Sequence, residues 1–164
     1  MSAADKSPAV SPFDDALRLM PGPVAVIGVA GDETAGGLTA AWVTRVSMDP
    51  VLLLVSIGHT RFTWELLSGT TEFTVSVLAD GQVPEARLFG LNSRRDVDKW
   101  SQVDHVVMGD RTPALERCTA RYLCKLQDRF TTGDHDCIIG RVTAAEVVDG
   151  PPALPLRAAD YAPA

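Results

Sequence analysis

Cysteine is scarce in this sequence, and the three cysteines present follow no familiar spacing. Cys118, Cys124 and Cys137 are an odd number and form no C-x-x-C pair. This spacing excludes a disulfide framework, which needs paired cysteines, and a zinc knuckle, which needs closely spaced ligands. We therefore expect three small buried hydrophobic side chains in a reducing compartment, and hence a cytoplasmic protein.

Long apolar runs and clustered positive charge are also missing. No segment approaches the ~20 apolar residues of a membrane span, and residues 1–10 lack the apolar block of a signal peptide. The 15 Lys and Arg residues are outnumbered by 21 Asp and Glu residues, which gives a net charge of −6. Because phosphate neutralisation needs clustered cations, we expect neither nucleic acid nor membrane as a partner.

The motifs of self-sufficient catalysis are absent as well. The sequence contains no catalytic triad, no metal-binding cluster and no Walker loop, and Gly28 with Gly31 is too sparse for a dinucleotide fingerprint. No residue is identified as a strong nucleophile or general base. If the protein is an enzyme, a cofactor must supply the reactive group.

Short strand patterns dominate what is present. Apolar alternation and short apolar runs predict strands at residues 24–30, 38–48, 51–57, 73–77, 120–128 and 135–148. Short helices are predicted at residues 11–20, 60–68 and 84–89. Without a repeated βαβ unit, these elements predict one mainly β (α+β) domain over residues 11–150, an antiparallel barrel with short peripheral helices. Residues 1–10 are expected to form a disordered tail and residues 151–164 a C-terminal arm on a surface.

Several of these elements carry an expectation about burial. The apolar run 51–57 is expected to be buried on both faces, and the alternating segment 73–77 on one face. Residues 92–112 are polar and predicted to be irregular. The first helix presents one apolar stripe, made of Phe13, Ala16, Leu17 and Met20.

The segment 58–63 is the first candidate site. It follows an apolar strand, and Thr60 is placed to cap the next helix, so that free backbone amides would face one point. His59, Thr60, Arg61 and Thr63 can converge on that point, as a phosphate site requires. An ordinary capped surface helix with a solvated arginine is the alternative that the residues leave open.

Two other segments could contact a ligand. Small residues within 37–44 would let a flat ligand lie close to the backbone, although small residues also fit the taper of a barrel strand. The turn Gly133-Asp134-His135 places a histidine at a strand start, where it either meets a ligand at the barrel mouth or stands on the surface.

Several of these segments follow one another in a characteristic order between Phe13 and about Val148. In sequence they are Pro21-Gly22-Pro23-Val24-Ala25-Val26, Gly37-Leu38-Thr39-Ala40, Val43-Thr44-x-Val46-Ser47-x-Asp49-Pro50, Thr60-x-x-Thr63, Phe73-x-Val75-x-Val77-Leu78, Gly133-Asp134-His135 and Gly140-x-Val142. Taken together they resemble the flavin-reductase-like family of FMN-binding split β-barrels. Trp42 stands where many two-component reductases have serine, which is similar to the flavoredoxin and ferric reductase branch.

The resemblance implies a flavin site and roles for particular residues. The isoalloxazine ring would contact the strand residues Thr39, Ala40, Ala41, Trp42, Val43 and Thr44. The ribityl chain and phosphate would lie near Ser56, His59, Thr60, Arg61 and Thr63. His135 would seat the nicotinamide so that its C4 hydride faces flavin N5. No metal ligand is implied.

The resemblance also implies partners and an activity. Members of the family work as homodimers with the flavin near the subunit interface, and Trp42, Trp64 and Trp100 are more large aromatics than a small barrel interior holds easily. The leading hypothesis is an NAD(P)H:flavin oxidoreductase, using NADH or NADPH and FMN or FAD, that passes reduced flavin to a partner monooxygenase. A flavoprotein that retains FMN and reduces a protein, metal or small-molecule acceptor is the second hypothesis. A non-catalytic flavin- or haem-binding module is the third.

Overall fold

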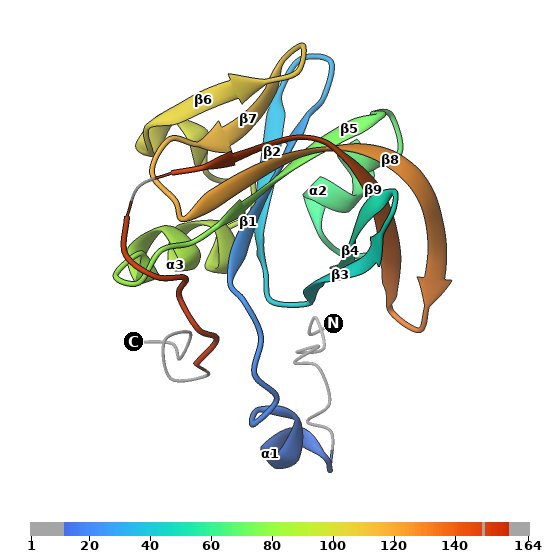
Figure 1. Cartoon of the computed structure of the whole chain (residues 1–164), viewed down its shortest axis with the longest axis vertical. Coiled ribbons are helices and arrows are strands. Elements are labelled where there is room, and N and C mark those ends of the chain that lie inside the picture. Colours follow the sequence, from blue (N-terminus) through green and yellow to red (C-terminus); the bar gives the residue numbers. More distant parts are fainter. Residues whose placement is uncertain (1–11, 149, 158–164) are drawn as a thin grey trace, which may run out of the picture.

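Nine strands make up nearly half of the described chain, residues 12–148 and 150–157 of this computed structural model (Figure 1). The strands are β1 (Ala25–Ala30), β2 (Ala35–Ala40), β3 (Val43–Met48), β4 (Val51–Gly58), β5 (Glu72–Val77), β6 (His105–Met108), β7 (Thr112–Leu115), β8 (Ala120–Thr132) and β9 (His135–Val147). The helices are α1 (Asp14–Leu17), α2 (Phe62–Leu67), α3 (Val83–Leu91) and the 3₁₀ turn η1 (Trp100–Gln102). The expected tail at residues 1–10 and residues 158–164 of the expected arm lie outside the described residues.

Seven strands form one sheet that closes on itself. Its order is β2-β1-β5-β8-β9-β4-β3, and every neighbouring pair is antiparallel. The two edge strands, β2 and β3, are joined by Ala41 and Trp42 alone, so the sheet must curl until its edges meet. The main apolar core fills the interior of this curved sheet. The predicted fold class, a mainly β antiparallel split barrel with short peripheral helices, is confirmed.

The strand β1 is buried on both faces because it separates two apolar cores. Alternate residues face opposite sides: Ile27 belongs to the barrel core, whereas Val26 belongs to a second core under α3 and η1. On this outer side Gly28 lies against β7, where an added Cβ would stand 2.1 Å from the carbonyl oxygen of Pro113. A glycine is therefore required for the hairpin β6–β7 to approach the barrel this closely.

The burial of β4 and β5 is the reverse of the sequence prediction. In β4 only alternate residues, such as Val55 and Ile57, are buried, and Val51 is 43% exposed. In β5 both faces are buried, since Thr74 Oγ1 donates to the Pro113 carbonyl at 2.5 Å and Ser76 Oγ accepts from the Leu115 amide. The outer face of β5 is covered by β7, which supplies both partners, Pro113 and Leu115. β7 pairs with β6, which forms together with η1 in the region 92–112 that is predicted to be irregular.

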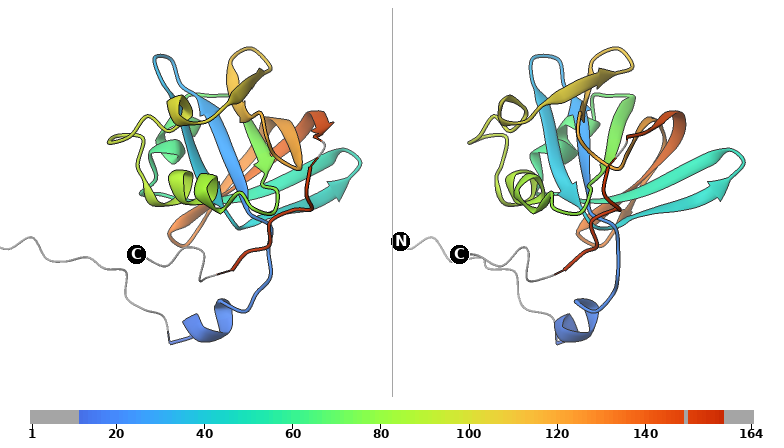
Figure 2. Two further views of the ribbon diagram at one scale, coloured as in Figure 1. Left: turned by 90° about the vertical axis from the view of Figure 1, so that its left-hand side faces the viewer. Right: turned by 60° about the vertical axis from the view of Figure 1, so that its left-hand side comes forward.

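Two other elements differ from their predicted extents. The single strand predicted over 38–48 is broken at Ala41 and Trp42 into β2 and β3. The first helix is one turn long, contains no buried residue and stands away from the barrel (Figure 2). Its predicted stripe is not buried, because nothing in the described chain packs over Leu17 or Met20, which are 52% and 63% exposed.

The segment after β9 lies along the second core. Leu154 is 1% exposed and its amide donates to the Leu78 carbonyl at 2.8 Å, while the Leu156 amide donates to Gly22. Cys118 and Cys124 are buried as expected, but Cys137 is only half-buried. None of the described helices has the length and apolarity to cross a membrane.

Candidate functional site

A hollow of about 170 Å³ opens where the edges of the sheet meet, and we call it the strand hollow. Its lining comes from β2, the link to β3, the end of β4 and the start of β9. The lining residues are Leu38, Thr39, Ala40, Ala41, Trp42, Ser56, Ile57, Gly58, Arg61 and His135. Seven of the residues predicted from the sequence therefore meet here.

The break between β2 and β3 creates one wall of the strand hollow. The carbonyl of Trp42 accepts a hydrogen bond from the Ser56 amide at 3.0 Å, and the indole ring remains 62% exposed. Its ring centre lies 4.8 Å from that of His135, in a tilted arrangement. Two aromatic rings thus flank an opening whose floor is small side chains and backbone.

The orientation of His135 is set by its neighbours. His135 Nδ1 lies 2.6 Å from the Asp134 carboxylate, and this hydrogen bond together with the histidine charge lowers the pKa of Asp134. The turn before it needs Gly133, whose φ is +63°. On the opposite strand, an added Cβ at Gly58 would stand 3.3 Å from His135 Nε2, so a glycine leaves room for the ring.

A second hollow, about 120 Å³, adjoins the first and shares Leu38 and Arg61 with it. We call it the cationic hollow, because four basic side chains surround it. Its lining is Gly37, Leu38, Thr60, Arg61, Phe62, Thr63, Phe89, Asn92, Ser93, Arg94, Arg95 and Lys99. In a chain of net charge −6, this concentration of positive charge favours an anionic ligand.

The basic side chains differ in how much of their charge is already paired. Arg95 forms an ion pair with Glu65 and lies over the Phe62 ring, with its guanidinium carbon 5.3 Å from the ring centre. Arg94 Nε donates to the Ala35 carbonyl at 3.2 Å. The guanidinium of Arg61 forms no hydrogen bond or ion pair with any described residue. Arg61 is therefore the cation most available to a bound anion.

Lys99 supports the cationic hollow from behind. It is 2% exposed, and its ammonium group donates to the carbonyls of Gly37 at 2.6 Å and Asn92 at 2.9 Å. These bonds tie the loop that carries Arg94 to β2. Burial, reinforced by the charges of Arg61 and Arg94, lowers the pKa of Lys99 to about 8.

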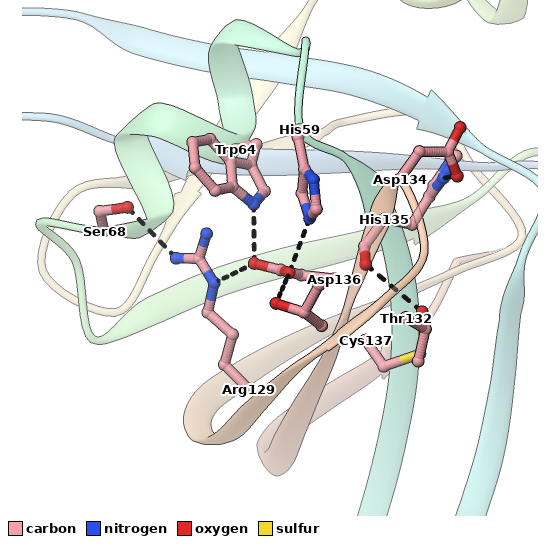
Figure 3. A network of polar contacts seen from close by, with 10 residues as sticks. His59, Trp64, Ser68, Arg129, Thr132, Asp134, His135, Asp136 and Cys137 are labelled. Atoms are coloured by element: carbon pink, nitrogen blue, oxygen red, sulfur yellow. Dashed lines mark hydrogen bonds and ion pairs between the residues drawn. The ribbon is translucent and has the colours of Figure 1, made fainter.

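Three predicted site residues line neither hollow. Val43 packs against the barrel core and Thr44 is exposed on β3. The ring of His59 is bound to the buried carboxylate of Asp136 (Figure 3). The predicted cap is also wrong: α2 begins at Phe62, and its N-cap residue is Arg61, with no side-chain cap hydrogen bond. The cationic side chains, rather than a capped helix end, make this region suitable for an anion.

The sequence reasoning missed the 92–99 loop. Ser93, Arg94 and Arg95 lie just after the end of α3, and Lys99 follows four residues after Arg95. The sequence did offer one signal for this loop: three cationic residues within a stretch of six, in a chain that is acidic as a whole. Their contact with 58–63 depends on how α3 packs on β2, and local sequence does not specify that packing.

A larger hollow lies elsewhere. It measures about 690 Å³ and is lined by the start of α3 and by segments near Ala79, Arg117 and Pro151. None of the predicted site residues lines it. Among the described residues, no group of three or more His, Cys, Asp or Glu side chains could hold a metal ion.

The fold is that of a split-barrel protein, and the two adjoining hollows, one of them lined by basic side chains, are its candidate site. Residues 17–161 match the family described as "Flavin reductase like domain", and the chain belongs to this family. The resemblance found in the sequence is thereby confirmed.

Relatives of known name support the same assignment. The chain is 32% identical over 163 residues to "NADH:riboflavin 5'-phosphate oxidoreductase" of Streptomyces pristinaespiralis, covering 94% of this chain and 89% of that one. It is 30% identical to "Stachydrine N-demethylase reductase subunit Stc3" of Rhizobium meliloti, covering 74% of this chain and 53% of that one. The chain also matches a second relative from the same organism, and it covers 38% of that relative's length. The structure of the styrene monooxygenase flavin reductase of Pseudomonas putida S12 superposes with a TM-score of 0.79 at 25% identity, covering 93% and 95% of the two chains.

The depressed pKa of Lys99 predicts a pH dependence of stability. Between about pH 8 and the ordinary lysine pKa of 10.5, the unfolded chain keeps the Lys99 proton that the folded chain has lost. Stability contributed by this site therefore rises with pH across that window. We expect the unfolding free energy of wild type, relative to Lys99→Met, to increase by up to about 1.4 kcal/mol per pH unit.

Urea denaturation at several pH values between 8 and 10.5 measures this difference. Lys125→Met is the matched control, because Lys125 is exposed on β8 and its ammonium group stays in water. If the difference in unfolding free energy between wild type and Lys99→Met stayed constant or fell with pH, it would contradict the lowered pKa of Lys99.

Proposed function

We propose that the chain is an NAD(P)H:flavin oxidoreductase that uses FMN and delivers reduced flavin to a partner monooxygenase. The observation that carries this proposal is the strand hollow beside the cationic hollow, joined through Arg61 and Leu38. A flat, largely neutral ring system linked to a phosphate matches this pair of environments. Membership in the flavin-reductase-like family supports the same reading. The three free cysteines suit the reducing cytoplasm, where we place the protein.

The residues present fit a flavin mononucleotide. Thr39, Ala40 and Ala41 leave the backbone of the strand hollow accessible to a ring, and Ser56 lies across the same hollow. Arg61, with Arg94 behind it, would hold the phosphate in the cationic hollow. When bound, the flavin supplies the hydride acceptor that the side chains of the described chain do not provide.

His135 is placed to orient the nicotinamide. Its ring stands at the mouth of the strand hollow against Trp42 and is held by Asp134 at 2.6 Å. A fixed, partly exposed ring can position a planar substrate and exclude water from the opening, which is the contribution that proximity makes to hydride transfer. In this proposal the chain binds and aligns the two reactants, and His135 touches the nicotinamide.

The proposal predicts oxidation of a nicotinamide nucleotide that depends on added flavin. We expect the purified chain to oxidise NADH or NADPH in the presence of FMN or FAD, followed as loss of absorbance at 340 nm. An anaerobic flavin spectrum before and after the nucleotide reports reduction directly. Failure of both nucleotides with both flavins would remove the reductase proposal and favour a binding module.

The same spectrum separates the two redox hypotheses. Trp42, 62% exposed beside the strand hollow, offers a ring surface that could retain a flavin between turnovers. A protein that retains FMN through purification, and is then reoxidised only by an added acceptor, would indicate the flavoprotein alternative. Colourless protein that reduces added FMN in many turnovers would indicate a reductase that treats flavin as a substrate.

Arg61 predicts a difference between flavins with and without phosphate. We expect Arg61→Ala to weaken FMN binding roughly 10- to 150-fold, because a charge-assisted contact contributes about 1.5–3 kcal/mol, and to change riboflavin binding little. Fluorescence titration measures both affinities. Arg111→Ala is the control and should change neither, because the exposed Arg111 side chain pairs with Asp32 and lines neither hollow. Equal losses for both flavins would place Arg61 away from the phosphate.

We also propose that the working unit is a homodimer. Two apolar groups face solvent: the β3–β4 hairpin, where Val46 is 47% and Met48 70% exposed, and the α1 segment, where Leu17, Leu19 and Met20 are exposed. Because α1 stands away from the described part of its own barrel, a second molecule would supply the apolar contacts that it lacks there (Figure 2). Since Trp42 lies at the start of this hairpin, a partner on β3 would also reach the strand hollow.

The homodimer predicts that one charge on β3 separates the subunits. Size-exclusion chromatography with light scattering should give twice the mass of one chain for wild type and a mass nearer one chain for Val46→Asp. Val107→Asp is the matched control, since Val107 is 60% exposed on β6, on another part of the molecule (Figure 1). A monomeric wild type that binds FMN would contradict the proposal.

A further inference from the structure

A buried carboxylate lies behind the wall of the strand hollow. Asp136, on β9, is 4% exposed and accepts four side-chain hydrogen bonds (Figure 3). Its Oδ1 accepts from Thr131 Oγ1 at 2.9 Å and lies 2.8 Å from His59 Nε2. Its Oδ2 accepts from Trp64 Nε1 at 2.8 Å and from Arg129 Nε at 2.6 Å.

This network uses the full accepting capacity of the carboxylate. Burial alone would raise the pKa of Asp136, but the hydrogen bonds from Arg129, Trp64, His59 and Thr131 outweigh it and hold the pKa well below its usual range. Asp136 is therefore ionised at neutral pH. It lines neither hollow, so it can affect the site only through its chain neighbour His135 and through the residues it holds.

The donors belong to three segments of the chain that this carboxylate ties together. Arg129 and Thr131 lie on β8, Trp64 lies on α2, and His59 lies in the loop between β4 and α2. Arg129 also contacts the Trp64 ring, 4.8 Å from its centre, and donates to Ser68 Oγ. The Oδ2 side of the carboxylate thus anchors α2 to the barrel, whereas the Oδ1 side holds His59.

His59 connects this carboxylate to both halves of the site. Its amide donates to the Asp134 carbonyl at 3.1 Å, next to His135. On its other side, Arg61 donates its amide to the Gly58 carbonyl at 3.1 Å and extends into both hollows. Fixing the ring of His59 therefore restrains the backbone from which Arg61 and the histidine turn reach the ligand.

We propose that Asp136 is a positioning residue, whose buried carboxylate acts through His59 to place Arg61 for the flavin phosphate. The inference rests on the proposed function, because it assigns the phosphate of a flavin to Arg61. Asp136 itself makes no contact with the ligand.

Flavin binding without any hydride donor tests the proposal. Asp136→Asn keeps the shape of the side chain but removes its charge and one acceptor. We expect it to reduce the preference for FMN over riboflavin, measured by fluorescence titration, roughly five- to tenfold, because the phosphate contact is displaced rather than deleted. Hydrogen exchange of the unliganded protein should show faster exchange in the peptide spanning residues 58–61.

Trp64→Phe is the matched control. It removes one hydrogen bond to the same carboxylate, on the Oδ2 side, and it retains an aromatic ring beside that of His59, whose centre lies 5.3 Å from the Trp64 ring. Both variants should lose stability, but Trp64→Phe should keep the FMN preference within about twofold of wild type. An equal loss of preference in the two variants would overturn the proposal, because the network would then act as a general support.

His59→Asn tests separately whether His59 connects Asp136 to Arg61. It also replaces Asp136→Asn in the test if that variant does not fold. We expect it to lower the FMN preference as Asp136→Asn does, and the double variant to lose no more than either single variant. Folded variants with wild-type FMN preference would overturn the positioning role alone. A wild-type chain without any preference for FMN over riboflavin would instead contradict the proposed flavin site.

Discussion

The two-residue link between β2 and β3 is the constraint on which the rest of the structure depends. The strands it joins stand at opposite ends of the sheet order, so a link this short is compatible only with a closed sheet. Closure also brings residues far apart in sequence to one place, since the link faces the start of β9. The strand hollow is a direct consequence, because its walls are the link itself and the strand ends opposite it.

Closure explains why some sequence predictions succeeded and others did not. Element types followed from local periodicity, and the long alternating patterns of β8 and β9 are typical of strands. The extent of burial was harder to predict, because it depends on what covers the outer face. Thr74 and Ser76 look like solvent-facing positions in sequence, yet both are buried, since the hairpin β6–β7 packs over them and supplies backbone partners. A polar side chain does not reveal whether water or a backbone carbonyl will satisfy it.

The candidate site was predictable in part, and for an identifiable reason. Residues 39–42 and His135 were found because each belongs to a short contiguous motif. Lys99 and Asp136 were missed because their roles appear only in three dimensions: one binds carbonyls on β2 and α3, the other collects donors from β8, α2 and a loop. His59 shows the reverse error. Its position close to Arg61 suggested a ligand contact, but its ring is bound to Asp136 and lines neither hollow.

Charge, rather than volume, distinguishes the candidate site from the larger hollow. The hollow near α3 has several times the volume of either site hollow, but Asp80 and Glu85 lie in its lining against one arginine, Arg117. An anionic cofactor entering it would meet the same sign of charge that dominates the whole chain. In the cationic hollow the balance is reversed locally. The pKa of Lys99 falls mainly because its ammonium group is buried, and the charges of Arg61 and Arg94 lower it further. A bound phosphate would offset the repulsion among these cations, which supports the proposal of an anionic ligand at this hollow.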